Sequence, residues 1–301
     1  MQLKHRTTIT DVINLAAPQT WTGSITPAVV GLAISYRKLG YLDPVMTLCF
    51  FAIVLLMQSA VNAFDDYADF VKGTDTLENS PDAYDAVIVY GMAPRTALLL
   101  GMLFLVLAAV PAAYVVLTVG YVPAVIGGIG ALVIFWYAFG KYPLSYLPLG
   151  EVFCGFVLGG LVPFAGVYMQ TRQLDFFVLV EVIPPIMGLA VNMFSNNGCD
   201  IARDKPAGRH TLACLIGQKR TDLLYRILLI LWALSPAVVL AAQCRFMGAG
   251  VYLLSMFAFV HLIVRQFKLQ LGPEKREAVM TGATTLVSLV GIAYSFSMQL
   301  G

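Results

Sequence analysis

Charged residues are scarce in this chain: Asp, Glu, Lys and Arg make up 12% of its 301 residues, about half the share of a typical soluble domain. Hydrophobic residues make up 59% and gather in long apolar runs. This balance argues against a soluble protein and indicates a membrane protein, with the lipid bilayer as a partner. The net charge of +2 is too small to indicate a nucleic-acid partner.

Paired cysteines and a signal peptide are missing as well. The five cysteines are an odd number and form no C-x-x-C pair, so neither a disulfide framework nor a zinc site is indicated. The N-terminal stretch MQLKHRTTITDVIN lacks the short apolar run and the small-residue cleavage site of a removable signal peptide. We therefore expect the first membrane segment to direct insertion.

Long apolar runs are abundant instead. About 20 apolar residues span a bilayer as a helix. The sequence predicts nine such segments, near residues 13–35, 43–65, 95–118, 121–140, 148–170, 176–197, 222–242, 246–266 and 278–299. The predicted fold is an all-α membrane protein with nine transmembrane helices in a bundle around a central cavity, forming a single domain over residues 1–301.

Several of the predicted segments are interrupted by prolines, the first and the sixth among them. Pro18 and Pro27 lie in the first segment, and Pro184 and Pro185 lie in the sixth. A proline in a spanning helix is tolerated when neighbouring helices re-satisfy the freed backbone groups. Such kinks also suit a bundle that opens a cavity.

Lys and Arg are distributed unequally between the two sides of the predicted bundle. Of the 19 Lys and Arg residues, fourteen fall on the side of the N-terminus, four fall on the other side, and Arg226 lies inside the seventh segment. Because cytoplasmic loops carry the excess of positive charge, we expect a cytoplasmic N-terminus and an outer C-terminus. A bacterial plasma membrane is the expected location.

Two polar stretches break the apolar pattern, each directly after an even-numbered segment, so both fall on the predicted cytoplasmic side. The first reads NAFDDYADFVKGTD (62–75), and the second reads NMFSNNGCDIARDKPAGRHTLA (192–213). In the second stretch Asn196, Asp200 and Asp204 are spaced four apart, which places them on one face of a helix that continues the sixth segment. We interpret the two stretches as parts of one site.

Spacing in the first stretch is similar. Asn62, Asp66 and Asp69 follow one another at intervals of four and three residues. Clustered carboxylates repel one another and stay ionised only if cations neutralise them. Oxygen ligands select Mg²⁺ or Ca²⁺, and Mg²⁺ typically binds one or two carboxylates plus substrate phosphates. Two aspartate clusters can therefore hold a diphosphate through bridging Mg²⁺.

Plainer readings apply to some of these residues. Asp and Asn at helix ends often serve as caps or as solvated charges, and this reading suits Asp65, Asp82 or Asp85 taken alone. We also expect the run EKRE at residues 274–277 to be solvated surface.

The motifs and the nine spans resemble the UbiA superfamily of intramembrane prenyltransferases over nearly the whole chain. DYADFVKGTD (66–75) is similar to the first motif of 1,4-dihydroxy-2-naphthoate prenyltransferases, N-D-Y-x-D-x-x-K-G-x-D. NNGCDIARDKPAGRHTLACLIG (196–217) is similar to their second motif, N-N-x-x-D-x-x-x-D-x-x-A-G-K-x-T-L-A. YLPLGE (146–151) is similar to a shared L-G-E or L-G-D at the start of the fifth helix.

Two positions depart from the family pattern. The first-motif Asn of the family falls at Asp65, and Asn62 stands three residues earlier. Arg209 replaces the common Lys, which keeps the charge and adds a bidentate fork.

The resemblance implies a Mg²⁺-dependent prenyltransferase. A polyprenyl group passes from a polyprenyl diphosphate to an aromatic small-molecule acceptor, inside a site that keeps water from the developing carbocation. With 1,4-dihydroxy-2-naphthoate as the acceptor, CO₂ leaves and demethylmenaquinone forms, a step of menaquinone biosynthesis. No organic cofactor is implied.

The resemblance also implies roles for individual residues. The residues that hold Mg²⁺, and through it the diphosphate, are Asp66, Asp69, Asp200 and Asp204, with Asp75 as a further ligand. The substrate-binding residues are Asn62, Asp65, Lys72, Asn196, Arg209, Tyr137, Lys141 and Glu151. The last three are candidates for the acceptor or a proton relay, although Tyr137 also reads as an interfacial aromatic and Glu151 as a complement to a helix dipole.

Two alternatives stay open. Within the superfamily the acceptor can be 4-hydroxybenzoate, homogentisate, a porphyrin or a glycerol phosphate, and the D-x-x-K-G-x-D form favours the naphthoate. A membrane transporter also suits interrupted spans, but it should carry coupling residues near the bilayer midplane. Here the acidic residues gather at one surface, and only Asn192 and Glu181 read as deeper.

Overall fold

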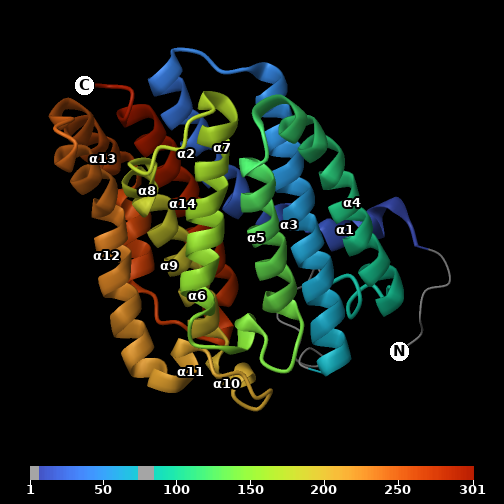
Figure 1. Ribbon diagram of the computed structural model, residues 1–301. Helices are drawn as coiled ribbons and strands as arrows, with labels where there is room; N and C mark the ends of the chain where they lie inside the picture. Colours follow the sequence, from blue (N-terminus) through green and yellow to red (C-terminus); the bar gives the residue numbers. More distant parts are fainter. Residues whose placement is uncertain (1–6, 74–84) are drawn as a thin grey trace. The chain divides into compact units, whose positions relative to one another are not determined.

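The structure, a computed structural model, describes residues 7–73 and 85–301, and every regular element in those ranges is a helix (Figure 1). Six helical segments of the described chain are long and apolar enough to cross a membrane. They are α3 (Pro44–Lys72), α4 (Pro94–Val119), α6 to α7 (Gly150–Thr171), α12 (Gln218–Ala242), α13 (Phe246–Lys268) and η4 to α14 (Pro273–Ser297). The protein is therefore an all-helical integral membrane protein, and the count of nine spans and the orientation stay predictions.

The other three predicted segments differ from simple spans. Helix α5 (Val122–Ala138) is apolar but has 17 residues. The first segment is divided into α1 (Ile9–Ala16) and α2 (Thr22–Leu39), because Ala17 adopts a left-handed conformation with φ of 48° directly before Pro18. The sixth segment is divided into α8 (Val178–Glu181) and α9 (Ile183–Cys199). Both breaks lie close to prolines that interrupt these two predicted segments, Pro18 and Pro184.

Contacts group the chain into two compact units. The first unit contains the residues up to Thr22 together with Cys49–Ser145, and the second contains Gly23–Leu48 together with Tyr146–Gly301. The first polar stretch belongs to the first unit and the second polar stretch to the second unit. The predicted single domain stays a prediction.

Aromatic packing holds the first unit together around α3. Phe64 is fully buried, and its ring centroid lies 5.3 Å from that of Phe135 and 5.5 Å from that of Phe139. Helix α4 approaches closely at Gly101, where a Cβ atom would lie 2.7 Å from the Phe64 ring. Phe64, one aromatic residue of the first polar stretch, is thus part of the core.

Helix α9 is the centre of the second unit. Helices α12 and α14 and the α6–α7 segment pack against it, and α9, α12 and α14 run side by side in Figure 1. Between α6 (Gly150–Cys154) and α7 (Val162–Thr171) the chain is π-helical over Gly155–Leu161, labelled η3. At the end of α9 remote from the second polar stretch, an ion pair between Arg37 and Glu181 joins α2 to α8.

One of the two prolines of α9, Pro185, is compensated as expected. Pro185 has no N–H group, so the carbonyl of Glu181 four residues earlier receives no helical hydrogen bond from it. The hydroxyl of Tyr294 on α14 donates to that carbonyl at 2.9 Å. A neighbouring helix therefore re-satisfies the freed group, in agreement with the prediction for this kink.

Candidate active site

The second polar stretch starts on α9 and continues on the short helix α10 (Ile201–Asp204). Helix α9 ends at Cys199 because Asp200 leaves the helical conformation, with φ of −100° and ψ of 4°. The prediction of one continuous helix through Asp204 was wrong in this respect. The four-residue relationship survives, because the N–H of Asp204 donates to the carbonyl of Asp200 at 2.8 Å.

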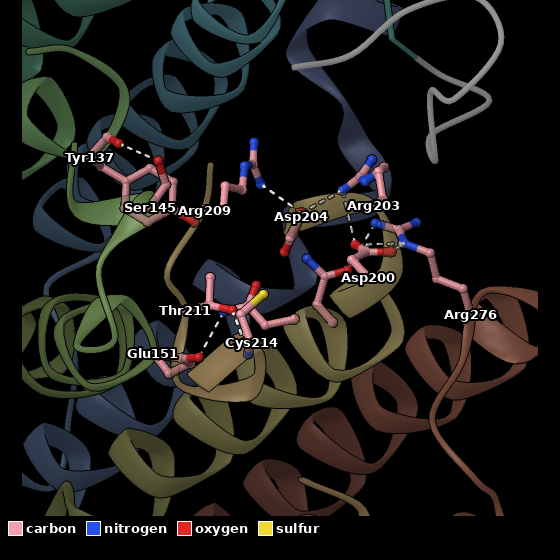
Figure 2. A network of polar contacts seen from close by, with 12 residues as sticks. Tyr137, Ser145, Glu151, Asp200, Arg203, Asp204, Arg209, Thr211, Cys214 and Arg276 are labelled. Carbon is pink, nitrogen blue, oxygen red and sulfur yellow. Dashed lines mark hydrogen bonds and ion pairs between the residues drawn. The ribbon is translucent and has the colours of Figure 1, made fainter. Parts of the chain in front are cut away.

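Asp200 and Asp204 are both buried, with 5% and 1% of their surface exposed, and arginines surround them (Figure 2). Nη2 of Arg203 lies 3.1 Å from Oδ2 of Asp200 and 3.7 Å from Oδ1 of Asp204. Nη1 of Arg209 lies 3.8 Å from Oδ1 of Asp204. The positive charge predicted at Arg209 is therefore beside the second motif, and Arg203 is an addition that the motif comparison missed.

A third arginine comes from a distant part of the sequence. Nε of Arg276, the first residue of α14 (Arg276–Ser297), donates to Oδ1 of Asp200 at 3.1 Å, and its Nη2 donates to Oδ1 of Asn196 at 2.8 Å. The prediction that the run at 274–277 is solvated surface was wrong for Arg276, whose side chain is 17% exposed. No local pattern distinguished this arginine from its charged neighbours.

Guanidinium groups outnumber carboxylates among the described side chains of this cluster. Two carboxylates face three guanidinium groups. Guanidinium forks match phosphate oxygens in two-point geometry. The cluster formed by Asp200, Asp204, Arg203, Arg209 and Arg276 is called the Asp–Arg cluster below.

The donor set of the Asp–Arg cluster also fits Mg²⁺, because Asp200 and Asp204 offer hard carboxylate oxygens. Within residues 7–73 and 85–301, no group of three or more His, Cys, Asp or Glu side chains is arranged for a metal ion. A Mg²⁺ ion at this site would thus take its remaining ligands from phosphate oxygens and water, which is its usual habit in proteins.

The loop after α10 packs back on Tyr146. The guanidinium of Arg209 lies 5.1 Å from the centre of the Tyr146 ring, and the N–H of His210 donates to the Tyr146 carbonyl at 2.8 Å. Thr211 then caps α11 (Leu212–Ile216) by accepting from the N–H of Cys214 at 3.3 Å. Burial raises the pKa of the Cys214 thiol, so this group stays neutral at physiological pH.

Glu151 stands at the start of α6 and contacts the second motif. Only 4% of its surface is exposed, and its Oε1 accepts a hydrogen bond from Nδ2 of Asn197 at 2.8 Å. Asn197 is the neighbour of Asn196, whose side chain accepts from Arg276. The structure thus places Glu151 within the second unit at the same end of α9 as the Asp–Arg cluster (Figure 2).

The first motif lies on helix rather than after it, because α3 continues to Lys72 and stops at Gly73, where φ is 69°. Asp69 is buried, and Asp65 and Asp66 are partly buried. Oδ2 of Asp66 accepts from the N–H of Ala86 at 2.9 Å. The position of Asp75 lies outside the described residues.

Asp85 is buried and caps the turn at residues 86–89 rather than a helix. Its Oδ1 accepts from the N–H of Val87 at 2.9 Å and from the N–H of Ile88 at 2.7 Å. Asp82 lies outside the described residues.

Contacts of Asn62 and Lys72 lie within the first unit. Nδ2 of Asn62 donates to the Ala16 carbonyl and to Oγ1 of Thr20, both at 2.9 Å. Lys72 donates from Nζ to the carbonyl of Ala138. Asn62 therefore fixes the turn after α1 against α3.

Two acceptor candidates come from the end of α5. The carbonyl of Tyr137 accepts from the Ser145 hydroxyl at 2.8 Å, and the Tyr137 side chain is partly buried (Figure 2). Lys141 is exposed, and its Nζ lies 5.4 Å from the centre of the Tyr142 ring.

Comparison with known proteins identifies the family. The UbiA prenyltransferase family matches residues 24–296 of this chain. The chain belongs to the UbiA prenyltransferase family. It is therefore a UbiA-type prenyltransferase, an enzyme of the transferase class.

Curated relatives agree with this family. The 1,4-dihydroxy-2-naphthoate octaprenyltransferase of Bacillus subtilis (strain 168) is 34% identical over 208 residues, which are 68% of this chain and 65% of that protein. UbiA prenyltransferase domain-containing protein 1 of Rattus norvegicus is 30% identical over 259 residues, which are 84% of this chain and 74% of that protein.

The UbiA fold is also seen among solved structures. A UbiA homolog from Archaeoglobus fulgidus bound to GPP and Mg²⁺ superposes with a TM-score of 0.71 at 14% identity, covering 95% of this chain and 98% of that chain. At this identity the likeness concerns the fold alone.

Proposed function

We propose that this UbiA-family protein transfers a polyprenyl group from a polyprenyl diphosphate to 1,4-dihydroxy-2-naphthoate in a Mg²⁺-dependent reaction that releases CO₂ and yields demethylmenaquinone. The observation that carries the proposal is the Asp–Arg cluster, in which three guanidinium groups surround two buried carboxylates. The Bacillus subtilis relative supports the choice of acceptor. The Archaeoglobus fulgidus homolog bound to GPP and Mg²⁺ supports the diphosphate and the metal.

Each residue of the Asp–Arg cluster has a defined task in this proposal. Arg209 and Arg276 bind phosphate oxygens of the diphosphate, and Asp200 and Asp204 hold Mg²⁺. Mg²⁺, when bound, supplies the charge neutralisation that makes diphosphate a leaving group. Asn196 keeps the Arg276 fork oriented through its 2.8 Å hydrogen bond.

The first motif takes part on sequence grounds. Asp66 and Asp69 hold Mg²⁺ at the same diphosphate, Asp75 is a further ligand, and Lys72 contacts a phosphate oxygen. Asp65 stands where the family has Asn and adds negative charge near this metal. Asn62 acts indirectly, because its amide group is bonded to the turn after α1.

The acceptor and the membrane complete the proposal. Tyr137, Lys141 and Glu151 serve the aromatic acceptor, and the polyprenyl tail is held by apolar surface within the bilayer. The excess of Lys and Arg on one side supports a cytoplasmic location for the N-terminus and both motifs, in a bacterial plasma membrane.

A product assay by mass spectrometry tests the proposal. Purified protein receives Mg²⁺, a polyprenyl diphosphate and either 1,4-dihydroxy-2-naphthoate or 4-hydroxybenzoate. The Asp200→Ala, Asp204→Ala double variant is compared with Asp175→Ala, which removes an exposed carboxylate from the loop before α8. We expect a prenylated naphthoquinol from the parent protein and Asp175→Ala, and none from the double variant.

Other outcomes would change specific parts of the proposal. Turnover with 4-hydroxybenzoate in place of the naphthoate would keep the site and replace the acceptor. The site would be overturned if the parent protein transferred the prenyl group to no acceptor and the double variant bound the prenyl diphosphate as the parent does.

A further inference from the structure

The carboxylate of Glu151 is only half satisfied. Its Oε1 accepts from Asn197, whereas its Oε2 is buried and accepts no hydrogen bond from the described part of the chain. A buried oxygen without a hydrogen bond destabilises the folded protein. Ionisable groups retained inside a membrane protein at such a cost usually have a function.

The position of Glu151 is fixed by close helix packing. A Cβ atom at Gly155 would lie 2.6 Å from the Ile186 carbonyl oxygen, and one at Gly159 would lie 2.4 Å from the Pro185 carbonyl oxygen. Only glycine permits this approach of the π-helical segment to α9, and π-helical turns are frequent at functional sites. The two segments run antiparallel, so the contact continues from Gly155 towards the start of α6 and the end of α9. There Glu151 meets Asn197.

Asn197 presents Glu151 in one orientation. The amide of Asn197 donates through Nδ2 to Oε1, which leaves Oε2 as the available proton acceptor. The adjacent Asn196 contacts the Asp–Arg cluster, since it accepts from Arg276. The end of α9 thus contacts the Asp–Arg cluster through one asparagine and the buried Glu151 through the next.

We propose that Oε2 of Glu151 takes a hydroxyl proton from the aromatic acceptor during prenyl transfer and returns it afterwards, with Asn197 as the positioning residue. The proposal rests on the proposed function. It makes Glu151 a catalytic residue and Asn197 a residue that acts through it.

The proton and electron balance explains why Glu151 can act as a proton shuttle, a group that takes a proton and later returns it. When the hydroxyl proton moves to Oε2, an electron pair of the ring forms the new bond to the allylic carbon, and the C–O bond to diphosphate breaks with its pair on the diphosphate. The ring carbon that is attacked carries the carboxylate, so a β-keto acid results. Loss of CO₂ leaves an enolate oxygen, which takes the proton back from Glu151. No net proton is produced, so a buried base that exchanges none with water is sufficient.

The test uses the full-length protein and the carboxamide variant Glu151→Gln. Its side-chain oxygen can still accept from Asn197, but the group no longer takes a proton at neutral pH. We expect kcat to fall by about 10²-fold or more, the usual contribution of general acid–base catalysis, with little change in the Kd of the prenyl diphosphate. Glu181→Gln is the matched control, because it also removes a buried glutamate from the second unit, and we expect it to keep the parent kcat.

The pH profile separates a catalytic role from a structural one. A phenolic hydroxyl ionises near pH 10, so the rate of Glu151→Gln should rise about tenfold per pH unit between pH 7 and 9, as the acceptor loses its proton unaided. The parent protein should show a nearly flat profile in that range. Asn197→Ala should lower kcat less than Glu151→Gln and keep the flat profile, because the base is still present.

Two results would overturn the shuttle. One is a parent-like kcat in Glu151→Gln, and the other is a lowered kcat whose pH profile runs parallel to that of the parent protein. Failure of the parent protein to prenylate any hydroxylated aromatic would instead overturn the proposed function, and the shuttle with it.

Discussion

Arg276 reaches Asp200 across 76 residues of sequence and places its Nε 3.1 Å from Oδ1 and 3.2 Å from Oδ2 of that carboxylate. Its Nη2 holds Asn196 at the same time. The Arg276 guanidinium, at the start of α14, therefore contacts both Asn196 in the last turn of α9 and Asp200, at which α9 ends. This contact makes α14 part of the candidate active site.

Arg276→Ala should weaken binding of the prenyl diphosphate. A charge-assisted hydrogen bond contributes about 1.5–3 kcal/mol, so the Kd should rise by about tenfold or more. Arg276→Lys should recover part of the loss, because it keeps the charge without the planar fork. Isothermal titration with a short-chain prenyl diphosphate and Mg²⁺ measures this change.

The control for Arg276 is its exposed neighbour. Lys275→Ala removes a charge of the same sign one residue away, where the side chain is exposed. It should leave the Kd within about twofold of the parent value. An unchanged Kd in Arg276→Ala would show that this arginine has only a structural contact with Asp200.

The second motif shows what a local pattern can predict. The four-residue spacing placed Asp200 and Asp204 together, and Arg209 followed from the same motif. Arg276 was beyond this reasoning, since the helix start at residue 276 is brought to Asp200 only by the packing of α14 on α9. The run EKRE carries no signal that one of its charges turns inward.

Helix boundaries also depend on more than the local sequence pattern. The apolar runs predicted where helices occur, because a chain that crosses the lipid must satisfy its backbone hydrogen bonds within a helix. The end of α3 was predicted near residue 65 but lies at Lys72, since the aspartates of the first motif are tolerated on a helical turn that Gly73 then ends. The break at Asp200 was likewise invisible, because the residues on both sides of it are individually compatible with helix.

Asn62 should act on stability rather than on catalysis. Its Nδ2 donates to both Ala16 and Thr20, and Nε1 of Trp21 donates to the same Ala16 carbonyl at 3.0 Å. Asn62→Asp removes both donors from a nearly isosteric side chain. We expect a loss of about 1–3 kcal/mol in stability, seen as a lower Tm in detergent.

The comparison variant for Asn62 is Thr20→Val, which removes only one of the two acceptors. Its Tm should lie between those of Asn62→Asp and the parent protein. If Asn62→Asp keeps the parent Tm but raises the Kd of the prenyl diphosphate, the amide serves the substrate directly and the stabilising role is wrong.

Lys38 should make stability depend on pH through Asp175. The hydrogen bond from Lys38 and that from the N–H of Phe177 hold the pKa of the Asp175 carboxyl below its usual value. Because the folded-state pKa is the lower one, the stabilisation is present above the unfolded value of about 3.9 and is lost as pH falls through the folded value. The effect is small, since the pair is exposed.

Thermal unfolding between pH 6 and pH 3 measures this dependence. Lys38→Met should have a lower Tm than the parent protein at pH 6, and the gap should close below about pH 4. Lys219→Met, which removes an exposed lysine from α12, is the control for lost positive charge. A gap that stays constant over the whole range would mean that Asp175 is not the group involved.

Tyr294 should stabilise α9 through the carbonyl that Pro185 leaves without a helical donor. Tyr294→Phe keeps the ring and removes the hydroxyl, so the Glu181 carbonyl loses its 2.9 Å hydrogen bond at a cost of about 1–3 kcal/mol. Tyr252→Phe is a matched control, because the equally buried Tyr252 donates at 2.7 Å to the carbonyl of Ala233. Ala233 lies inside α12, where the N–H of Ala237 can serve the same carbonyl, so this change should cost only about 0.5 kcal/mol. The two Tm values measured in the same detergent decide the point: a larger fall for Tyr294→Phe is expected, and equal falls would mean that the missing proline N–H does not set the importance of Tyr294.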